Sequence, residues 1–173
     1  MKIRGFIWKV AVLLLFMGCK TTPKFEGRGD LCGLVIDDFN NPVSGFVVTC
    51  RNNLNLSKSA LTNESGFFVF TDLPSDVYFI SGHKENYVEL KEVEYAFFDR
   101  SKIFCCQILN ADSAFDKVEN LILLENYQEC MELLESIHCE KPSNVLRVLT
   151  LYKEKIKAKL EESCCNESIE VDS

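Results

Sequence analysis

The sequence predicts a mainly β protein with an α extension, in which a seven-stranded antiparallel β-sandwich precedes about three C-terminal helices. Two observations predict it. Over residues 31–109, short apolar runs alternate with turn residues at intervals of roughly 8 to 12, the spacing of a β-sandwich. From residue 112 onward glycine disappears, and apolar residues recur three and four positions apart, as they do in amphipathic helices.

Composition places the chain among globular proteins. Of its 173 residues, 47% are hydrophobic and 11% aromatic, which is enough to build a packed core. The formal net charge is −7, and lysine and arginine do not cluster. Because nucleic-acid phosphates require cationic neutralisation, we expect no nucleic-acid partner.

The amino terminus reads as a targeting segment. Lys2, Arg4 and Lys9 form a positive region, followed by an uncharged run over residues 10–18. That run is well short of the ~20 apolar residues that a spanning helix needs. Residues 1–18 are therefore predicted to be a signal peptide rather than a membrane span.

Cys19 directly follows the small residue Gly18, and this arrangement resembles the lipobox of bacterial lipoproteins. The resemblance implies cleavage between Gly18 and Cys19, lipidation of the Cys19 thiol, and a membrane-anchored lipoprotein of the bacterial cell envelope, on its periplasmic or surface face. Phe16 and Met17 stand where the usual box has leucine and a small residue, so a permissive processing system is required. An uncleaved anchor and ordinary secretion are the alternatives.

Residues 19–30 are predicted to be the lipidated cysteine and a flexible tether, because they show no hydrophobic period and contain two glycines. They include Arg28-Gly29-Asp30, which resembles an integrin-binding tripeptide. Such a short motif arises often by chance, and its place beside a lipid anchor is poor for reaching another cell.

The region 31–109 carries several ordered motifs that together resemble the carboxypeptidase regulatory-like family, whose fold is a transthyretin-like or Ig-like β-sandwich. Asp76 and Asn86 replace two family glycines, and both residue types tolerate the left-handed conformation. The matching residues are Gly33, Val35, Asp37, Asn40, Pro42, Val43, Gly45, Val48, Thr62, Gly66, Phe68, Phe70, Leu73, Pro74, Tyr78 and Tyr87.

This resemblance implies no enzyme activity, because none of the motif residues is catalytic in the family and the zinc-protease dyad of true carboxypeptidases is absent. We expect no catalytic residue, no cofactor and no metal. His83, expected in an exposed turn, and His138 lack a recognisable nucleophile context.

Residues 112–163 form the predicted helical segment. Tyr127, Cys130 and Pro142 are spaced as in the second half of a tetratricopeptide repeat, with Glu125 in place of the usual glycine. A single degenerate repeat is too little for a solenoid, so three helices packed on themselves or on the sandwich are favoured over a partner-binding groove. Residues 164–173 are predicted to be a disordered acidic tail.

The chain has nine cysteines without CxxC spacing. Neighbours in a strand point to opposite faces, so Cys105 and Cys106 do not suit one metal site. Cys130 and Cys139 are expected on one helix, about 13 Å apart in rise. If Cys19 is lipidated, eight cysteines remain, and disulfides and buried free thiols are both open.

The sequence therefore predicts a non-enzymatic, membrane-anchored lipoprotein that acts as an envelope structural or protein-interaction module, with a protein partner that it does not identify. One alternative is a surface-exposed adhesin or host-binding lipoprotein. Another is an accessory carbohydrate- or enzyme-associated β-sandwich module, against which counts the loss of the single tryptophan, Trp8, with the signal.

Overall fold

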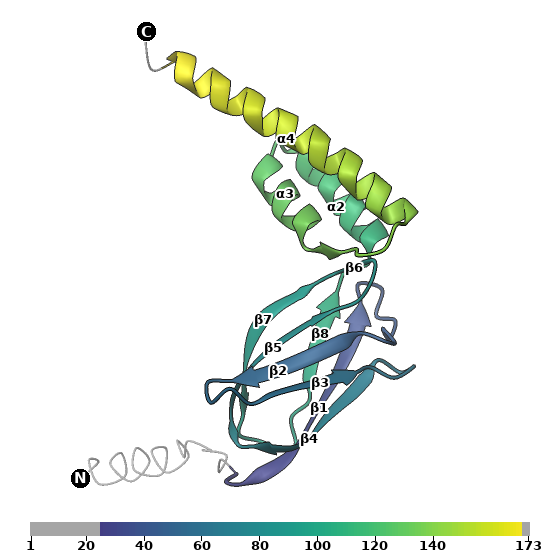
Figure 1. Cartoon of the computed structure of the whole chain (residues 1–173), viewed down its shortest axis with the longest axis vertical. Helices are drawn as coiled ribbons and strands as arrows, with labels where there is room; N and C mark the ends of the chain where they lie inside the picture. Colours follow the sequence, from purple (N-terminus) through teal and green to yellow (C-terminus); the bar gives the residue numbers. More distant parts are fainter. Residues whose placement is uncertain (1–24, 171–173) are drawn as a thin grey trace, which may run out of the picture.

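The computed structural model describes the backbone of residues 25–170 and the side chains of residues 25–162. A β-sandwich forms the first part, and a unit of three helices stacks on one end of it (Figure 1). The predicted signal peptide and the predicted site residues Gly18 and Cys19 lie outside the described residues.

The sandwich consists of a three-stranded sheet facing a four-stranded sheet, which confirms the seven predicted strands. The first sheet has the order β4-β1-β8 and the second the order β3-β2-β5-β7. The strands are β1 (Arg28–Asp37), β2 (Val47–Asn52), β3 (Ser57–Leu61), β4 (Phe67–Pro74), β5 (Asp76–His83), β7 (Leu90–Phe97) and β8 (Phe104–Ile108).

The prediction of a wholly antiparallel sandwich is wrong at one pair. Strand β8 lies parallel to β1, with Gly33 opposite Phe104 and Asp37 opposite Ile108. The chain leaves β7 in one sheet and crosses to the other, where it enters beside β1 and runs in the same direction. A crossover between sheets, unlike a hairpin, allows parallel neighbours.

Alternating side chains of both sheets form the core between them. Leu31 and Val35 of β1 are fully buried, as period-two alternation predicts. The ring of Phe68 lies edge-on to Phe70, with 5.3 Å between centroids, and packs directly over Gly33, where an added Cβ would lie 2.1 Å from the ring. Packing therefore requires glycine at position 33, because a side chain there would overlap the Phe68 ring.

A buried threonine ties the two sheets' connecting segments together. The Thr62 hydroxyl accepts a hydrogen bond from the Phe46 amide at 2.8 Å and donates one to the Val43 carbonyl at 2.6 Å. Its own amide donates to the Phe46 carbonyl at 3.0 Å. Thr62 is 4% exposed, so water cannot replace these bonds if the hydroxyl is lost.

Strand β1 begins inside the segment predicted as a flexible tether, so that prediction is wrong for residues 28–30. The Arg28 Nε lies 2.8 Å from an Asp72 carboxylate oxygen, and the Asp30 carboxylate accepts the Asp72 amide at 2.9 Å. Both charged ends of the Arg28-Gly29-Asp30 tripeptide are engaged with one neighbouring strand. The tripeptide is therefore part of a paired strand and not of a free loop.

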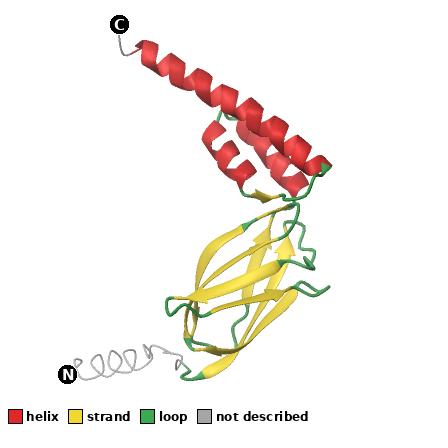
Figure 2. Ribbon diagram, in the orientation of Figure 1, coloured by secondary structure: helices red, strands yellow, loops and turns green. Residues whose placement is uncertain are grey.

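The helical unit contains α2 (Ala111–Leu123), α3 (Tyr127–Glu135) and α4 (Asn144–Glu170), as predicted (Figure 2). Asn110 is the N-cap of α2, and its side chain accepts a hydrogen bond from the Ser113 amide at 2.9 Å. Asn126 is the N-cap of α3. Glu125, at the position of the repeat glycine, has φ +57°. The buried residues of this second core are Ala111, Ala114, Val118, Leu121, Cys130, Leu134, Ile137, Leu149 and Ile156.

Helix α4 continues to Glu170, seven residues into the predicted disordered tail, so the prediction is wrong for the backbone of residues 164–170. The helix is 27 residues long. Within residues 25–170, no helix is both long and apolar enough to cross a membrane.

Replacing Thr62 with valine is expected to destabilise the protein by about 2–3 kcal/mol, because it keeps the shape but leaves the Phe46 amide and the Val43 carbonyl buried without the hydroxyl. The matched control is Thr49→Val, which removes an exposed bond to Ser59 and should cost less than about 0.5 kcal/mol. Urea unfolding measures both. Equal effects of the two substitutions would contradict the role assigned to Thr62.

A candidate binding groove at the sandwich–helix junction

Three chain segments meet where the sandwich joins the helices. Strand β6 (Tyr87–Val88) pairs antiparallel with β9 (Ile137–His138), the short strand between α3 and α4. Asn86 donates its amide to the His138 carbonyl at 2.8 Å and accepts the Ala111 amide at 2.9 Å. The helices are thus attached to the sandwich by backbone hydrogen bonds as well as by the covalent link.

Asp76 and Asn86 were both expected to tolerate a left-handed backbone in place of glycine, and Asn86 adopts one. Asn86 has φ +65°, in the left-handed region, and its amide and carbonyl both serve the junction. Asp76 is not among the residues with positive φ and begins β5, where its carboxylate accepts the Asn52 side-chain amide at 2.9 Å. The expectation of a left-handed turn at Asp76 is therefore wrong.

The two histidines of the chain lie against each other at this junction. His83 is exposed, as expected, but it ends β5 instead of lying in a turn, and its ring centroid is 4.6 Å from that of His138 at a tilt of 39°. The His138 Nδ1 lies 2.9 Å from Glu89, and its Nε2 lies 3.5 Å from Glu140. Within the described residues, no group of three or more potential ligands could hold a metal ion.

Glu85 secures the loop that leads into α4. Its carboxylate accepts the amides of Glu140 and Lys141, each at 3.3 Å. Partial burial acts to raise the pKa of Glu85, but the two amide hydrogen bonds outweigh it, and the pKa lies below its ordinary value. The charged form of Glu85 is therefore the one that stabilises the junction.

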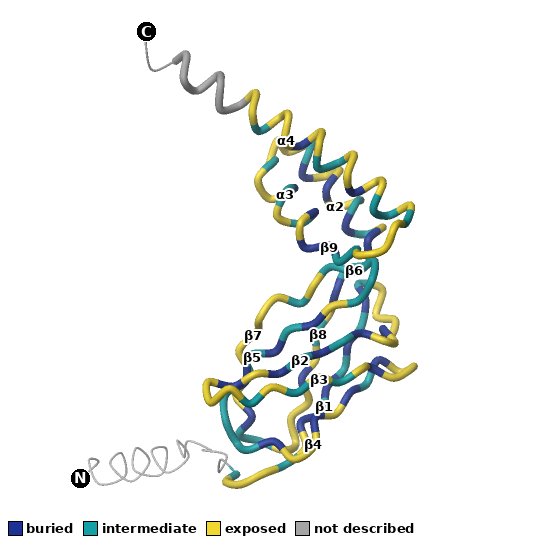
Figure 3. The backbone as a smooth tube through the Cα atoms, in the orientation of Figure 1, coloured by how far each residue is buried: buried dark blue, intermediate teal, exposed yellow. Residues whose placement is uncertain are grey.

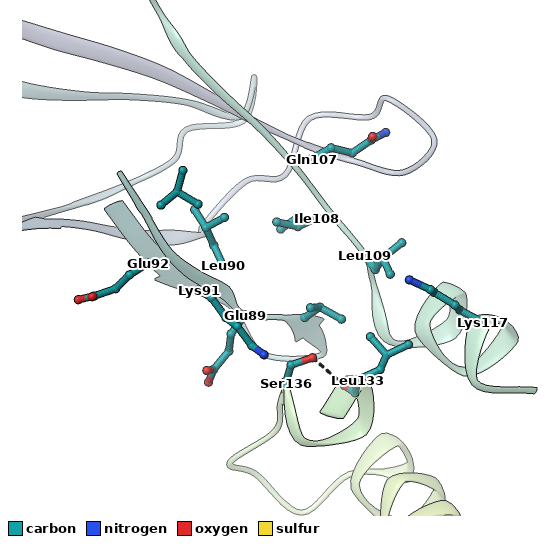
Figure 4. A pocket seen from close by; sticks show the side chains of 12 residues that line it. Glu89, Leu90, Lys91, Glu92, Gln107, Ile108, Leu109, Lys117, Leu133 and Ser136 are labelled. Carbon is teal, nitrogen blue, oxygen red and sulfur yellow. Dashed lines mark hydrogen bonds between the residues drawn. The ribbon is translucent and has the colours of Figure 1, made fainter. Parts of the chain in front are cut away.

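Beside this junction lies a groove of about 420 Å³, which we call the junction groove (Figure 4). It opens between the start of β7, the end of β8, the middle of α2 and the C-terminal part of α3. Six of its lining residues are apolar and six are polar or charged. The lining residues are Val88, Glu89, Leu90, Lys91, Glu92, Val93, Gln107, Ile108, Leu109, Lys117, Leu133 and Ser136.

The charges around the junction groove are unequally paired. Glu92 binds Arg51 at 2.6 Å, and Glu89 binds His138 at 2.9 Å. Lys91 makes no ion pair or hydrogen bond with a described residue, and Lys117 has only Glu129, at 4.0 Å. The rim thus offers two ammonium groups that the protein itself barely neutralises.

Both strands beside the groove are sheet edges. Strand β7 ends the order of the four-stranded sheet and β8 that of the three-stranded sheet. At the opposite seam, between β3 and β4, the Lys58 ammonium donates to the Thr71 carbonyl at 2.6 Å across the sheets. On the side of the groove, the sheets are in contact through Tyr95 of β7 and Phe104 of β8, whose ring centroids lie 5.4 Å apart.

Sequence reasoning did not find this groove. The sequence predicts strands within residues 31–109 and a helical segment from residue 112, but not that β7 and β8 are edges of different sheets. One signal was available: the alternation in residues 90–97 puts charged residues at several strand positions, as is common at sheet edges.

All six cysteines whose side chains are described are free thiols, so for them the free-thiol alternative holds. Burial raises the pKa of Cys50 and that of Cys106 to about 11, whereas Cys105 is exposed on the opposite face of β8. Cys139 lies beyond β9, not on one helix with Cys130 as predicted. The adjacent thiols of β8 therefore differ in accessibility, as strand geometry requires.

Comparison with known proteins places the chain in no family, since no family model and no curated protein matches it. Three solved structures share limited similarity with it. They are the TIE protein of Bacillus anthracis (15% identity, TM-score 0.44), a streptococcal ancillary pilin (13%, 0.42) and a DUF3823 family protein from Parabacteroides merdae (11%, 0.38).

These matches cover about half of the chain, 49%, 49% and 50% respectively. In the same order, they span 17%, 30% and 47% of the solved chains' own lengths.

Thiol alkylation should distinguish the two cysteines of β8. At pH 8, iodoacetamide is expected to modify Cys105 in the folded protein at least tenfold faster than Cys106, because burial keeps Cys106 protonated and covered. Peptide mass spectrometry over a time course measures both. In urea the two rates should converge, and similar rates in the folded protein would contradict this assignment.

The junction should weaken in acid. Since the folded pKa of Glu85 is depressed, its contribution is complete above the unfolded value near 4.5 and is lost as pH falls through the folded value. Glu85→Ala should therefore destabilise the protein near pH 6 and have a smaller effect near pH 3. Urea unfolding at both pH values measures this, with Glu64→Ala as an exposed control; a pH-independent effect of Glu85→Ala would contradict it.

Proposed function

We propose that this protein is a non-enzymatic protein-interaction module, anchored to a bacterial envelope membrane by lipid on Cys19. The observation that carries the proposal is the position of the first described residues, which begin at Phe25. The Phe25 amide donates to the Phe98 carbonyl at 3.1 Å, and the Ser75 amide donates to the Gly27 carbonyl at 2.8 Å. These bonds hold the first described residues at the end of the sandwich opposite the helices (Figure 1).

Only residues 20–24 separate Cys19 from Phe25. Five residues span at most about 18 Å, so a lipid on Cys19 would hold this end of the sandwich close to the membrane surface. The ten residues of β1 rise about 33 Å along the sandwich toward the helices. The helical unit and the junction groove would then be the parts that face away from the membrane.

Exposed apolar side chains on the helical unit support an interaction role. Leu123 and Leu124, at the turn between α2 and α3, are 81% and 76% exposed, and Leu151 of α4 is 67% exposed. Figure 3 shows how much of the outer surface of α4 is exposed. Large apolar residues at the end farthest from an anchor are where a partner would meet the protein.

The anchor has a direct test. In cells fed labelled palmitate, Cys19→Ala is expected to lose the label and to leave the membrane fraction. Cys105→Ala, which removes an exposed thiol of β8, should retain both. Labelled, membrane-bound Cys19→Ala protein would contradict the anchoring proposal.

The interaction role is tested separately, by cross-linking in intact cells followed by purification from gently solubilised membranes. We expect cross-linked partner peptides to map to the helical unit or the junction groove. Cross-links confined to the anchor end of the sandwich, near Phe25, would contradict the proposed orientation.

A further inference from the structure

We propose that the free edge of β7, together with the junction groove beside it, binds an extended acidic segment of a partner protein by strand addition. This inference rests on the proposed interaction role and specifies its site and the chemistry of the partner. Three observations carry it: an open sheet edge, a groove adjoining that edge, and two weakly neutralised lysines.

Strand β7 offers a long edge. It pairs with β5 from Asp76 opposite Phe97 to Gly82 opposite Leu90, with one register shift between Ile80 and Gly82, and no described strand pairs with its other side. Eight residues is longer than the usual edge strand, and residues 90–97 contain no proline. Every second residue therefore directs a backbone amide and carbonyl away from the sheet.

The junction groove supplies what an added strand needs beyond backbone hydrogen bonds. In strand addition, main-chain bonds provide affinity, and pockets for alternate side chains provide specificity. Leu90 and Val93 of β7 line the groove together with Ile108 of β8 and Leu133 of α3. Its volume of about 420 Å³ is within the range of natural ligand pockets and suits apolar side chains on one face of a bound strand.

The charges select the partner. The groove's acidic residues are already engaged, Glu92 with Arg51 and Glu89 with His138. Lys91 is unpaired among the described residues, and Lys117 reaches Glu129 only at 4.0 Å. In Figure 4 the Lys117 ammonium extends toward Leu109, over the groove. A carboxylate on the bound segment would form ion pairs with these two lysines, whereas a cation on the segment would be repelled by them.

One register of a self-pair is disfavoured by charge. An antiparallel β7–β7 pair centred on Val93 would place Glu92 opposite Glu94 twice, and like charges directly opposite each other destabilise a strand pair.

The test uses the purified full-length mature protein in mild detergent and fluorescein-labelled ten-residue peptides, with binding measured by fluorescence anisotropy. The parent peptide alternates valine and threonine and carries two glutamates. A second peptide has lysine in place of both glutamates. Two further peptides are N-methylated at alternate residues, one at the odd and one at the even positions, which removes backbone donors of one parity at a time.

We expect the acidic peptide to bind at least tenfold more tightly than the lysine peptide. One N-methylated peptide should lose binding and the other should retain it, because only one edge of an added strand faces β7. Equal binding of the acidic and lysine peptides, equal binding of the two N-methylated peptides, or no binding by any peptide would overturn the proposal.

Substitutions locate the site on the protein. Lys91→Gln and Lys117→Gln should each weaken binding of the acidic peptide about threefold, and together about tenfold, as expected for exposed ion pairs. Lys157→Gln, on the exposed surface of α4, is the matched control and should change nothing. If the three substitutions have equal effects, the groove is not the site.

This outcome is separable from the proposed interaction role. Cross-links between a partner and α4, combined with failure of the acidic peptide, would overturn the strand-addition site and leave the interaction role standing. Binding of the acidic peptide, combined with the absence of any cross-linked partner in cells, would support the strand-addition site and overturn the interaction role. Dimerisation through β7, seen as a doubled mass in light scattering and abolished by Val93→Pro, would also overturn the proposal.

Discussion

Backbone hydrogen bonds of a single short segment hold the two hydrophobic cores of this protein together. Asn86 bonds to His138 and to Ala111, and Tyr87 and Val88 pair with the strand between α3 and α4. Each partner belongs to the helical unit, while the segment itself continues directly from β5. The left-handed backbone at Asn86 makes this possible, because it turns both its amide and its carbonyl toward the helices. The groove beside β7 exists because this segment sets the distance between sandwich and helices.

Sequence patterns predicted the elements well because each depends on local chemistry. Period-two burial in β1 and period-three-and-four burial in α2 follow from backbone geometry, and Asn110 and Asn126 mark helix starts as N-caps do. Glycine at position 33 also has a physical reason, because the Phe68 ring packs directly over it. Pairing was less accessible, since the parallel alignment of β8 with β1 depends on how a loop crosses between sheets.

The candidate site was out of reach for the same reason. Lys91 and Lys117 are 26 positions apart, and nothing in their local sequence indicates that they line one groove. His83 and His138 are still farther apart in sequence, yet their ring centroids lie 4.6 Å apart. Both arrangements arise from tertiary docking of the helices on the sandwich. By contrast, the proposal for Cys19 rests on sequence alone, because it depends on neighbouring residues in the chain rather than on the fold.

The parallel pairing of β1 and β8 also bears on how the protein would respond to tension. If the chain is held at its amino-terminal end and a partner pulls on the helical unit, the load enters at the start of β1 and leaves from the end of β8. The two strands would then slide past each other along their length, so that all five residue pairs between them carry the force at once. An antiparallel hairpin pulled at its open end gives way one pair at a time. The crossover between the sheets, which the sequence did not predict, thus places β1 and β8 in a shear geometry when the two ends of the described structure are pulled apart.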